Sequence, residues 1–186
     1  DQKLVSLAHY DNLTRAANRH LFTDRLKQAL ENAKRYHQPI SLAYFDLDKF
    51  KPVNDTYGHH VGDELLKTFV QRVKTQLRKT DTLGRLGGDE FAVYLPANRM
   101  FHNQIDQLRK TLTQPLHIGQ HELIPSISIG YNLMDDLTSP CYELLSQTED
   151  SLLSAKRLGG NRCIEAQPLA IEKEERGKAK EKKEVT

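Results

Sequence analysis

Apolar residues recur along the chain with two alternating periods, which predict helices and strands in turn. A spacing of three and four runs from Phe22 to Ala33, behind Asn18, a residue suited to cap a helix. A short run of mostly apolar, β-branched or aromatic residues from Ile40 to Phe45 ends abruptly at Asp46, as expected of a buried central strand. Helical spacing returns from Leu65 to Leu77. The first half of the chain therefore predicts a helix, a strand and a second long helix.

The second half begins with a predicted hairpin. The segments Leu83–Leu86 and Phe91–Leu95 flank Gly87-Gly88-Asp89-Glu90, where glycine permits a tight turn that carries two carboxylates. The elements expected after it are a helix through Ile105, Leu108 and Leu112, a one-face-buried strand from Ser126 to Leu133, a helix from Pro140 to Gly159-Gly160, and an edge strand at Cys163–Glu165. This order predicts an α+β fold with helices packed on a central antiparallel-rich sheet, close to the ferredoxin-like plan.

Composition narrows the class of protein. The chain has 186 residues, of which 38% are hydrophobic, enough for one packed domain and too many for a disordered protein. Its net charge of +2 gives no strong field toward nucleic acid or an anionic membrane. A polymerase palm, which also uses strand-end carboxylates, therefore lacks a basic groove here. No apolar stretch approaches the roughly 18 residues of a membrane-spanning helix. Two distant cysteines, Cys141 and Cys163, favour a cytoplasmic protein.

Charge also divides the chain. Residues 172–186 hold eleven charged side chains, six basic and five acidic, and almost nothing apolar. Such a segment cannot bury enough surface to offset the entropy of ordering. We expect a helix or linker over 1–10, one folded domain over 11–166, and a charged, disordered tail over 167–186. The chain begins without Met, which suggests a domain cut from a longer protein, whose membrane anchor, if it has one, would lie outside this chain.

Carboxylates mark the candidate chemistry. Asp46-Leu47-Asp48 ends the predicted central strand, and Asp89-Glu90 lies at the hairpin tip. If the hairpin pairs beside that strand, these groups converge, and clustered carboxylates need a cation such as Mg²⁺. The alternative is that each is an ordinary strand-end or turn residue, because Asp is favoured in turns.

The combination of motifs resembles one family. Leu86-Gly87-Gly88-Asp89-Glu90-Phe91, preceded by Phe45-Asp46-Leu47-Asp48-Lys49-Phe50-Lys51 and Asn54-Asp55-Thr56-Tyr57-Gly58-His59, is similar to the GGDEF family of diguanylate cyclases, from about Asp11 to Cys163. The resemblance implies an adenylyl-cyclase-like fold and condensation of two GTP into cyclic di-GMP with release of two pyrophosphates. It further implies a homodimer of half-sites, Mg²⁺ or Mn²⁺, an attached sensory or regulatory domain, and no nucleic-acid partner.

The resemblance also assigns roles by position. Metal would be held by Asp46, the Leu47 carbonyl and Asp89, and Glu90 would orient the site or accept the hydroxyl proton. Gly87 and Gly88 would let the backbone approach the ribose and α-phosphate. The remaining implied contacts are guanine to Asn54 and Asp63, phosphates to the amides of Lys49 and Phe50 and to Lys51 and Lys156, and inhibitory product to Arg78 and Asp81.

Each of these positions has a local alternative. Asp63 would suit the first turn of a helix, and Asn54 would suit a helix cap. Lys51 and Lys156 would be solvated surface charges. Arg78-Lys79-Thr80-Asp81 would be a helix end and a turn, although its fixed register six residues before Gly87 favours the product site.

The sequence departs from the family at both ends. The usual Leu-Thr-Gly-Leu-Pro-Asn-Arg is here Leu13-Thr14-Arg15-Ala16-Ala17-Asn18-Arg19, and losing Gly and Pro is expected to loosen the turn. In the last helix Leu153 replaces a Tyr, and Gly160 replaces a phosphate-contacting Arg, a duty that Arg157 or Arg162 would have to assume. An intact Gly-Gly-Asp-Glu-Phe favours an active cyclase. The alternative is a weak or silent domain that senses GTP or cyclic di-GMP for an attached domain.

Overall fold

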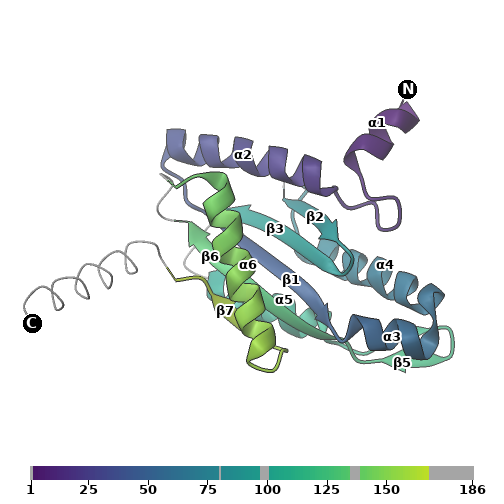
Figure 1. Ribbon diagram of the computed structural model, residues 1–186. Coiled ribbons are helices and arrows are strands. Elements are labelled where there is room, and N and C mark those ends of the chain that lie inside the picture. The colour runs from purple at the N-terminus through teal and green to yellow at the C-terminus, as the bar shows by residue number, and fades with distance from the viewer. Residues whose placement is uncertain (1, 80, 97–100, 135–138, 168–186) are drawn as a thin grey trace, which may run out of the picture.

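The computed structural model describes residues 2–79, 81–96, 101–134 and 139–167, so the expected charged tail lies, from residue 168 on, outside the described residues. Helices pack on both faces of a five-stranded sheet of order β2-β3-β1-β6-β7 (Figure 1). The helices are α1 (Gln2–His9), α2 (Arg19–Tyr36), α3 (Phe50–Tyr57), α4 (His59–Gln76), α5 (Phe101–Leu112) and α6 (Cys141–Arg157). The strands are β1 (Ile40–Asp48), β2 (Thr82–Gly87), β3 (Glu90–Pro96), β4 (Leu116–Ile118), β5 (His121–Leu123), β6 (Ser126–Met134) and β7 (Cys163–Glu165).

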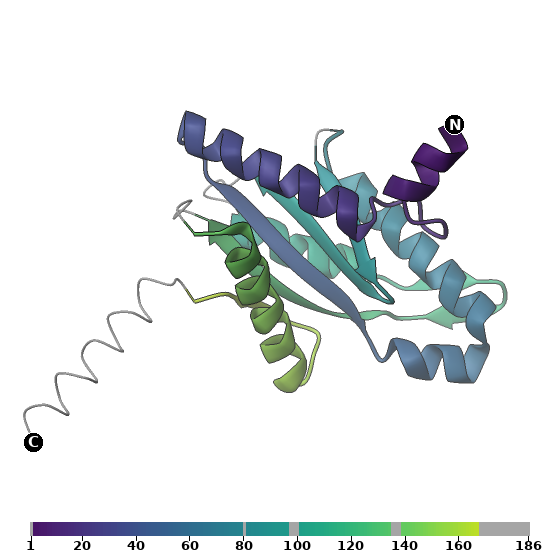
Figure 2. The same cartoon turned by 45° about the horizontal axis from the view of Figure 1, so that its top comes forward.

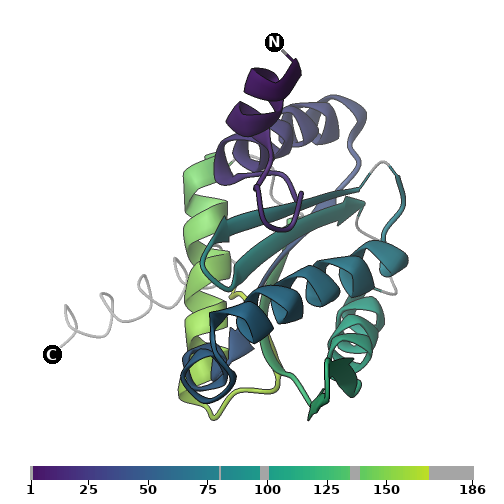
Figure 3. The same ribbon diagram turned by 90° about the vertical axis from the view of Figure 1, so that its right-hand side faces the viewer.

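Strand β1 is the centre of the sheet. It pairs antiparallel with β3 on one side and with β6 on the other, and only the short edge strand β7 runs parallel to its neighbour among the described strands. Helices α2 and α6 cover one face, and α4 and α5 cover the other (Figure 3). This arrangement confirms the predicted α+β fold.

Burial on both faces explains why most residues of β1 before Asp46 are apolar. Alternate side chains of a strand point to opposite faces. Leu42 packs with Phe22 of α2, whereas Phe45 packs with Phe69 of α4, and the Phe45 and Phe69 ring centroids lie 5.6 Å apart. Phe45 also stacks on Phe91 of β3 at 5.8 Å. Two cores thus fix β1, and with it the residues at its carboxyl end.

Most predicted elements are present, and two are additional. The Asn18 cap is confirmed, because its Oδ1 accepts a hydrogen bond from the Leu21 amide at 2.9 Å. Helix α3 was not predicted, since its residues 50–57 carry too few apolar positions to show a helical period. The β4–β5 hairpin was missed for a similar reason, because its strands have three residues each.

The turn between α1 and α2 is held by side-chain hydrogen bonds, although it lacks the Gly and Pro of the family motif. Arg15 adopts the left-handed conformation, with φ of 63°, that glycine would adopt without strain. Its guanidinium donates to Ser6 Oγ at 2.8 Å, and the Thr14 amide and hydroxyl both donate to Asp11 Oδ2. These side-chain contacts hold Arg15 in its left-handed conformation. No helix among the described residues is long and apolar enough to cross a membrane.

Candidate active site

The β2–β3 hairpin brings its carboxylates beside the end of β1, as predicted. Asp46 lies directly opposite Glu90 in the antiparallel register of β1 and β3. Gly87 pairs with Glu90, which leaves Gly88 and Asp89 as the turn, and Gly88 has a φ of +46° that favours glycine. Figure 2 shows the end of β1 beside this turn, immediately before α3. Asp46, Asp89 and Glu90 therefore gather at one end of the sheet.

Among the carboxyl groups of the site, Asp46 has the most strongly shifted pKa. Its side chain is 13% exposed, and its Oδ2 is 2.7 Å from Nζ of Lys156 on α6. Its Oδ1 is buried and finds no hydrogen-bond partner among the described residues. The pKa of Asp46 is raised to about 8, first by burial and then by the neighbouring Asp89 carboxyl group, while Lys156 opposes the rise. One carboxylate oxygen is thus desolvated and unpaired beside a second carboxyl group.

This donor set fits a hard divalent cation. Mg²⁺ typically takes one or two carboxylates and completes its shell with water and substrate phosphate oxygens. Asp46 and Asp89 supply two carboxylates, and the Leu47 carbonyl directly follows Asp46 in the chain. In the described part of the chain, no three His, Cys, Asp or Glu side chains are grouped to hold a metal by themselves. The site therefore fits a cation that arrives with its substrate better than a closed structural metal centre.

Glu90 of β3 lies near two charged residues of α6, namely Lys156 and Glu149, and sequence reasoning missed Glu149. Burial raises the pKa of Glu90, and the carboxylates of Glu149 and Asp89 raise it further, against Arg19 and Lys156. Glu149 precedes Lys156 by seven residues, about two helical turns, so the two share one face of α6. The seven-residue spacing from Lys156 is the sequence signal that could have identified Glu149.

Asp48 does not join this carboxylate group. Its oxygens accept hydrogen bonds from Ser126, Ser128 and the Asn161 amide. Of the carboxylates predicted to converge, the structure brings together Asp46, Asp89 and Glu90 and directs Asp48 elsewhere.

The predicted phosphate and base residues lie just beyond β1. Lys49 is left-handed, with φ of 58°, and α3 begins at Phe50 without a side-chain cap, so amides at its first turn lack helical partners. Lys51 is exposed on the same turn. An uncapped helix start next to a lysine can bind an anion.

Asn54 and Asp63 come from adjacent helices. Asn54 Oδ1 is buried, unpaired among the described residues, and pressed against Gly62, where a Cβ would lie 1.8 Å from it. Asp63 follows Gly62 and is exposed. The capping alternative for Asn54 is wrong, because Asn54 lies inside α3 and the cap of α4 is Gly58. The first-turn alternative for Asp63 is also wrong, because α4 has no acidic residue in its first turn.

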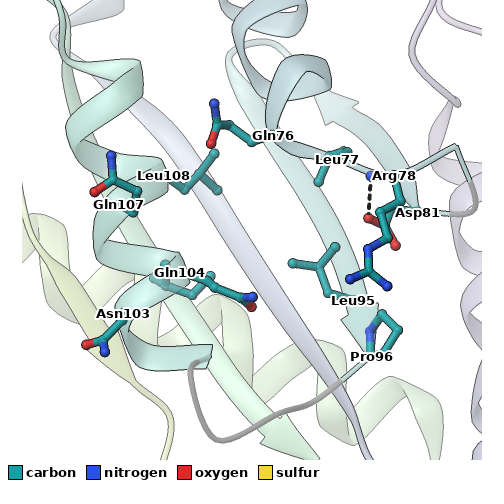
Figure 4. Close-up of a pocket in the computed structure, with 11 residues that line it drawn as sticks. Gln76, Leu77, Arg78, Asp81, Leu95, Pro96, Asn103, Gln104, Gln107 and Leu108 are labelled. Atoms are coloured by element: carbon teal, nitrogen blue, oxygen red, sulfur yellow. Dashed lines mark hydrogen bonds between the residues drawn. The ribbon is translucent and has the colours of Figure 1, made fainter.

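Arg78 and Asp81 line a cavity of about 640 Å³ at the other end of β3 (Figure 4). The Arg78 backbone amide donates to Asp81 Oδ2 at 2.7 Å, so the local turn role is present. The cavity lies between the end of α4, the end of β3 and the start of α5, and Gln104 and Gln107 contribute polar groups. The turn and the cavity coexist at this tetrapeptide.

Comparisons with known proteins agree with this geometry. The family model described as "Diguanylate cyclase, GGDEF domain" matches residues 8–162. The chain is 39% identical over 163 residues to the bifunctional diguanylate cyclase/cyclic di-GMP phosphodiesterase MucR of Pseudomonas aeruginosa, covering 87% of this chain and 24% of MucR. It is 33% identical over 160 residues to the cyclic di-GMP phosphodiesterase NbdA of the same organism, covering 85% of this chain and 20% of NbdA.

The fold has a solved counterpart. The coiled coil and GGDEF domain of DgcB from Caulobacter crescentus, in complex with cyclic di-GMP, superposes with a TM-score of 0.82 at 26% identity, covering 89% of each chain. The present chain spans a quarter or less of the length of MucR and NbdA. The signature turn beside Asp46, the sheet topology and the match over most of the chain place this protein in the GGDEF-domain diguanylate cyclase family.

Proposed function

We propose that this domain is a diguanylate cyclase that condenses two GTP into cyclic di-GMP and releases two pyrophosphates. The observation that carries the proposal is the buried, unpaired Oδ1 of Asp46 beside the Asp89 carboxyl group at the Gly-Gly turn. A desolvated carboxylate pair at an open turn is suited to phosphoryl chemistry, which depends on cations to offset developing negative charge.

The reaction balances in two equal steps. The 3′-hydroxyl of one GTP attacks the α-phosphorus of the other, the bond to pyrophosphate breaks, and the hydroxyl proton leaves. The same exchange in the opposite direction closes the ring. Bound Mg²⁺ or Mn²⁺ would offset charge on the α-phosphate and the departing pyrophosphate. Asp46, the Leu47 carbonyl and Asp89 would hold that cation. Glu90, whose raised pKa makes it a stronger base, would accept the proton or orient the hydroxyl.

GTP would lie across the start of α3. The amides of Lys49 and Phe50, with Lys51, would bind the β- and γ-phosphates. A Cβ at Gly87 or Gly88 would meet no atom within 4 Å, so the turn faces open space where the ribose and α-phosphate can approach. Lys156, which pairs with Asp46, would bind a phosphate of GTP, and Asp46 would then be available to hold the cation.

Asn54 and Asp63 would select guanine. Guanine presents neighbouring N1–H and N2–H donors, and a carboxylate such as Asp63 can accept from both, whereas adenine offers an acceptor at N1. Asn54 has an amide that both donates and accepts, and its Oδ1 is unpaired among the described residues.

A homodimer follows from the reaction, since each domain would hold one GTP and the two half-sites must face each other. Cyclic di-GMP would also bind Arg78 and Asp81 and inhibit the enzyme, which the cavity at these residues supports. The larger size of MucR and NbdA supports a sensory or regulatory domain attached to this one in the full-length protein.

A second candidate is a weak or silent domain that senses GTP or cyclic di-GMP for its attached domain. Gly160, in place of a phosphate-contacting arginine, favours it, as does the similarity to NbdA, which is named as a phosphodiesterase.

One experiment separates the two candidates. The purified chain is incubated with GTP and Mg²⁺, and products are separated by chromatography, with Asp89→Ala as the inactive control. Cyclic di-GMP from wild type alone supports the cyclase, and GTP binding without product supports the sensor. Activity per subunit measured over about a hundredfold dilution should fall as dimers dissociate, and a flat profile from a monomer would refute the two-half-site mechanism.

A further inference from the structure

Asp48, the last residue of β1, connects two segments that are distant in sequence. Its Oδ2 accepts from Ser126 Oγ at 2.6 Å and from the Asn161 amide at 2.9 Å, and its Oδ1 accepts from Ser128 Oγ at 2.7 Å. Ser126 lies opposite Asp48 in the β1–β6 register, whereas Asn161 belongs to the turn that follows α6. Hydrogen bonds to a charged carboxylate are stronger than neutral ones, so this residue is an anchor for that turn.

The anchor explains the glycine at position 160. Gly160 has a φ of +74°, which disfavours other residues, and a Cβ there would lie 2.8 Å from Asp48 Oδ2. An arginine at this position would have to displace the Asp48 carboxylate or change the backbone of the turn. In this chain the turn after α6 therefore has no basic side chain at position 160 and lies in close contact with β1.

The anchor also fixes the end of α6 relative to Asp46. Two polar contacts of the described residues join α6 and its following turn to β1, namely Lys156 with Asp46 at 2.7 Å and the Asn161 amide with Asp48 at 2.9 Å. The Gly160 amide donates back to the Ala155 carbonyl at 3.0 Å, so the turn and the last helical turn move together. If Lys156 leaves Asp46 to contact a phosphate, the Asp48 contact remains.

We propose that Asp48 is a positioning residue, which holds the Gly159–Asn161 turn against β1 and so keeps Lys156 within reach of both Asp46 and the triphosphate. The inference rests on the proposed function, because it assigns Lys156 to GTP. It adds a role for Asp48 that involves no contact with metal or substrate. Replacing Asp48 should therefore weaken GTP binding more than it slows turnover at saturation.

The test uses Asp48→Asn, which keeps the size of the side chain but replaces one acceptor oxygen by an NH₂ group. Asp150→Asn, an exposed charge change on α6, is the matched control. We expect faster hydrogen–deuterium exchange in the 157–163 peptide of Asp48→Asn. Titration with a non-hydrolysable GTP analogue and Mg²⁺ should give a Kd raised about tenfold, the scale expected for a misplaced binding group, and KM should rise alike while kcat changes less than about twofold. Asp150→Asn should match wild type in all three measurements.

Unchanged exchange would refute the anchor, and faster exchange with unchanged Kd would reduce Asp48 to a purely structural residue. Should Asp48→Asn unfold, Ser126→Ala removes one donor and should give the same changes at smaller amplitude. Failure of the proposed function has a different signature. If wild type binds GTP but forms no cyclic di-GMP, the cyclase proposal is overturned, and the comparison of Kd values still decides the positioning role of Asp48. If wild type binds no GTP, both proposals are overturned.

Discussion

Arg85 connects the start of the domain to its signature turn by contacting Asp11 and Gly88 at once. Its Nη1 lies 3.1 Å from Asp11 Oδ1, and its Nε donates to the Gly88 carbonyl at 2.9 Å. The pair is largely buried, with side chains 16% and 21% exposed for Arg85 and Asp11. Solvent therefore screens it less than a surface ion pair. The geometry of the turn that carries Asp89 thus depends on a residue that precedes α2.

The Asp11 contact predicts a pH dependence of stability. Burial alone would raise the pKa of Asp11, but hydrogen bonds from Thr14 and Arg85 outweigh it and lower the pKa below the usual 3.8. Because the folded pKa lies below the unfolded one, Asp11 stabilises the fold above about pH 4, and this stabilisation is lost as the pH falls through the folded pKa. Asp11→Asn should lower the free energy of unfolding by about 1–3 kcal/mol at neutral pH. In urea titrations the difference from wild type should shrink below about pH 4, and a constant difference would contradict the assignment.

The metal assignment predicts loss of turnover without loss of the fold. Asp46→Asn and Asp89→Ala should each abolish cyclic di-GMP formation, because the developing phosphate charge is left uncompensated. Asp46→Asn keeps the size of a side chain whose charged form burial already disfavours, so the circular dichroism spectrum and the melting temperature without metal should stay close to those of wild type. Mn²⁺ binding in the presence of a GTP analogue should weaken in both variants. Substantial activity in both would refute the assignment.

The base-recognition assignment predicts a change in nucleotide preference. Asp63→Ala should lower the affinity for GTP and bring it close to that for ATP, because the paired acceptors for guanine N1–H and N2–H are lost. Glu64→Ala is the matched control, since Glu64 is the next residue of α4 and pairs with Lys67 at 3.0 Å. Competition of GTP and ATP for a fluorescent guanine nucleotide measures both variants. An unchanged preference in Asp63→Ala would assign guanine recognition elsewhere.

The strands and the signature turn could be predicted from the sequence, because apolar periodicity and turn-forming residues determine them. Phe45 and Phe91 lie in apolar runs long enough to be strands, and the paired glycines at 87 and 88 permit a tight turn, so the juxtaposition of Asp46 with Asp89 was predictable. The ion pair of Lys156 with Asp46 was not, because it joins residues 110 positions apart and depends on how α6 packs on β1. The left-handed turn at Arg15 was not predicted, because a positive φ is unfavourable for a residue other than glycine. The side-chain contact of Arg15 with Ser6 offsets this cost, and residue propensity alone does not reveal that contact.

The position of Arg78 predicts that the product inhibits the enzyme by binding away from the carboxylates of the active site. Arg78 and Asp81 lie near the end of the hairpin opposite Glu90, so cyclic di-GMP bound there would not compete directly with GTP. A guanidinium can bind phosphate and stack on guanine, while the Asp81 oxygen not engaged by the Arg78 amide can accept from the base. Arg78→Ala should therefore relieve inhibition and leave initial turnover near that of wild type, whereas the exposed neighbour Lys79→Ala should stay inhibited. Calorimetric titration of cyclic di-GMP into the three proteins decides the matter. Equal binding by wild type and Arg78→Ala, or none by wild type, would return this tetrapeptide to a helix end followed by a turn.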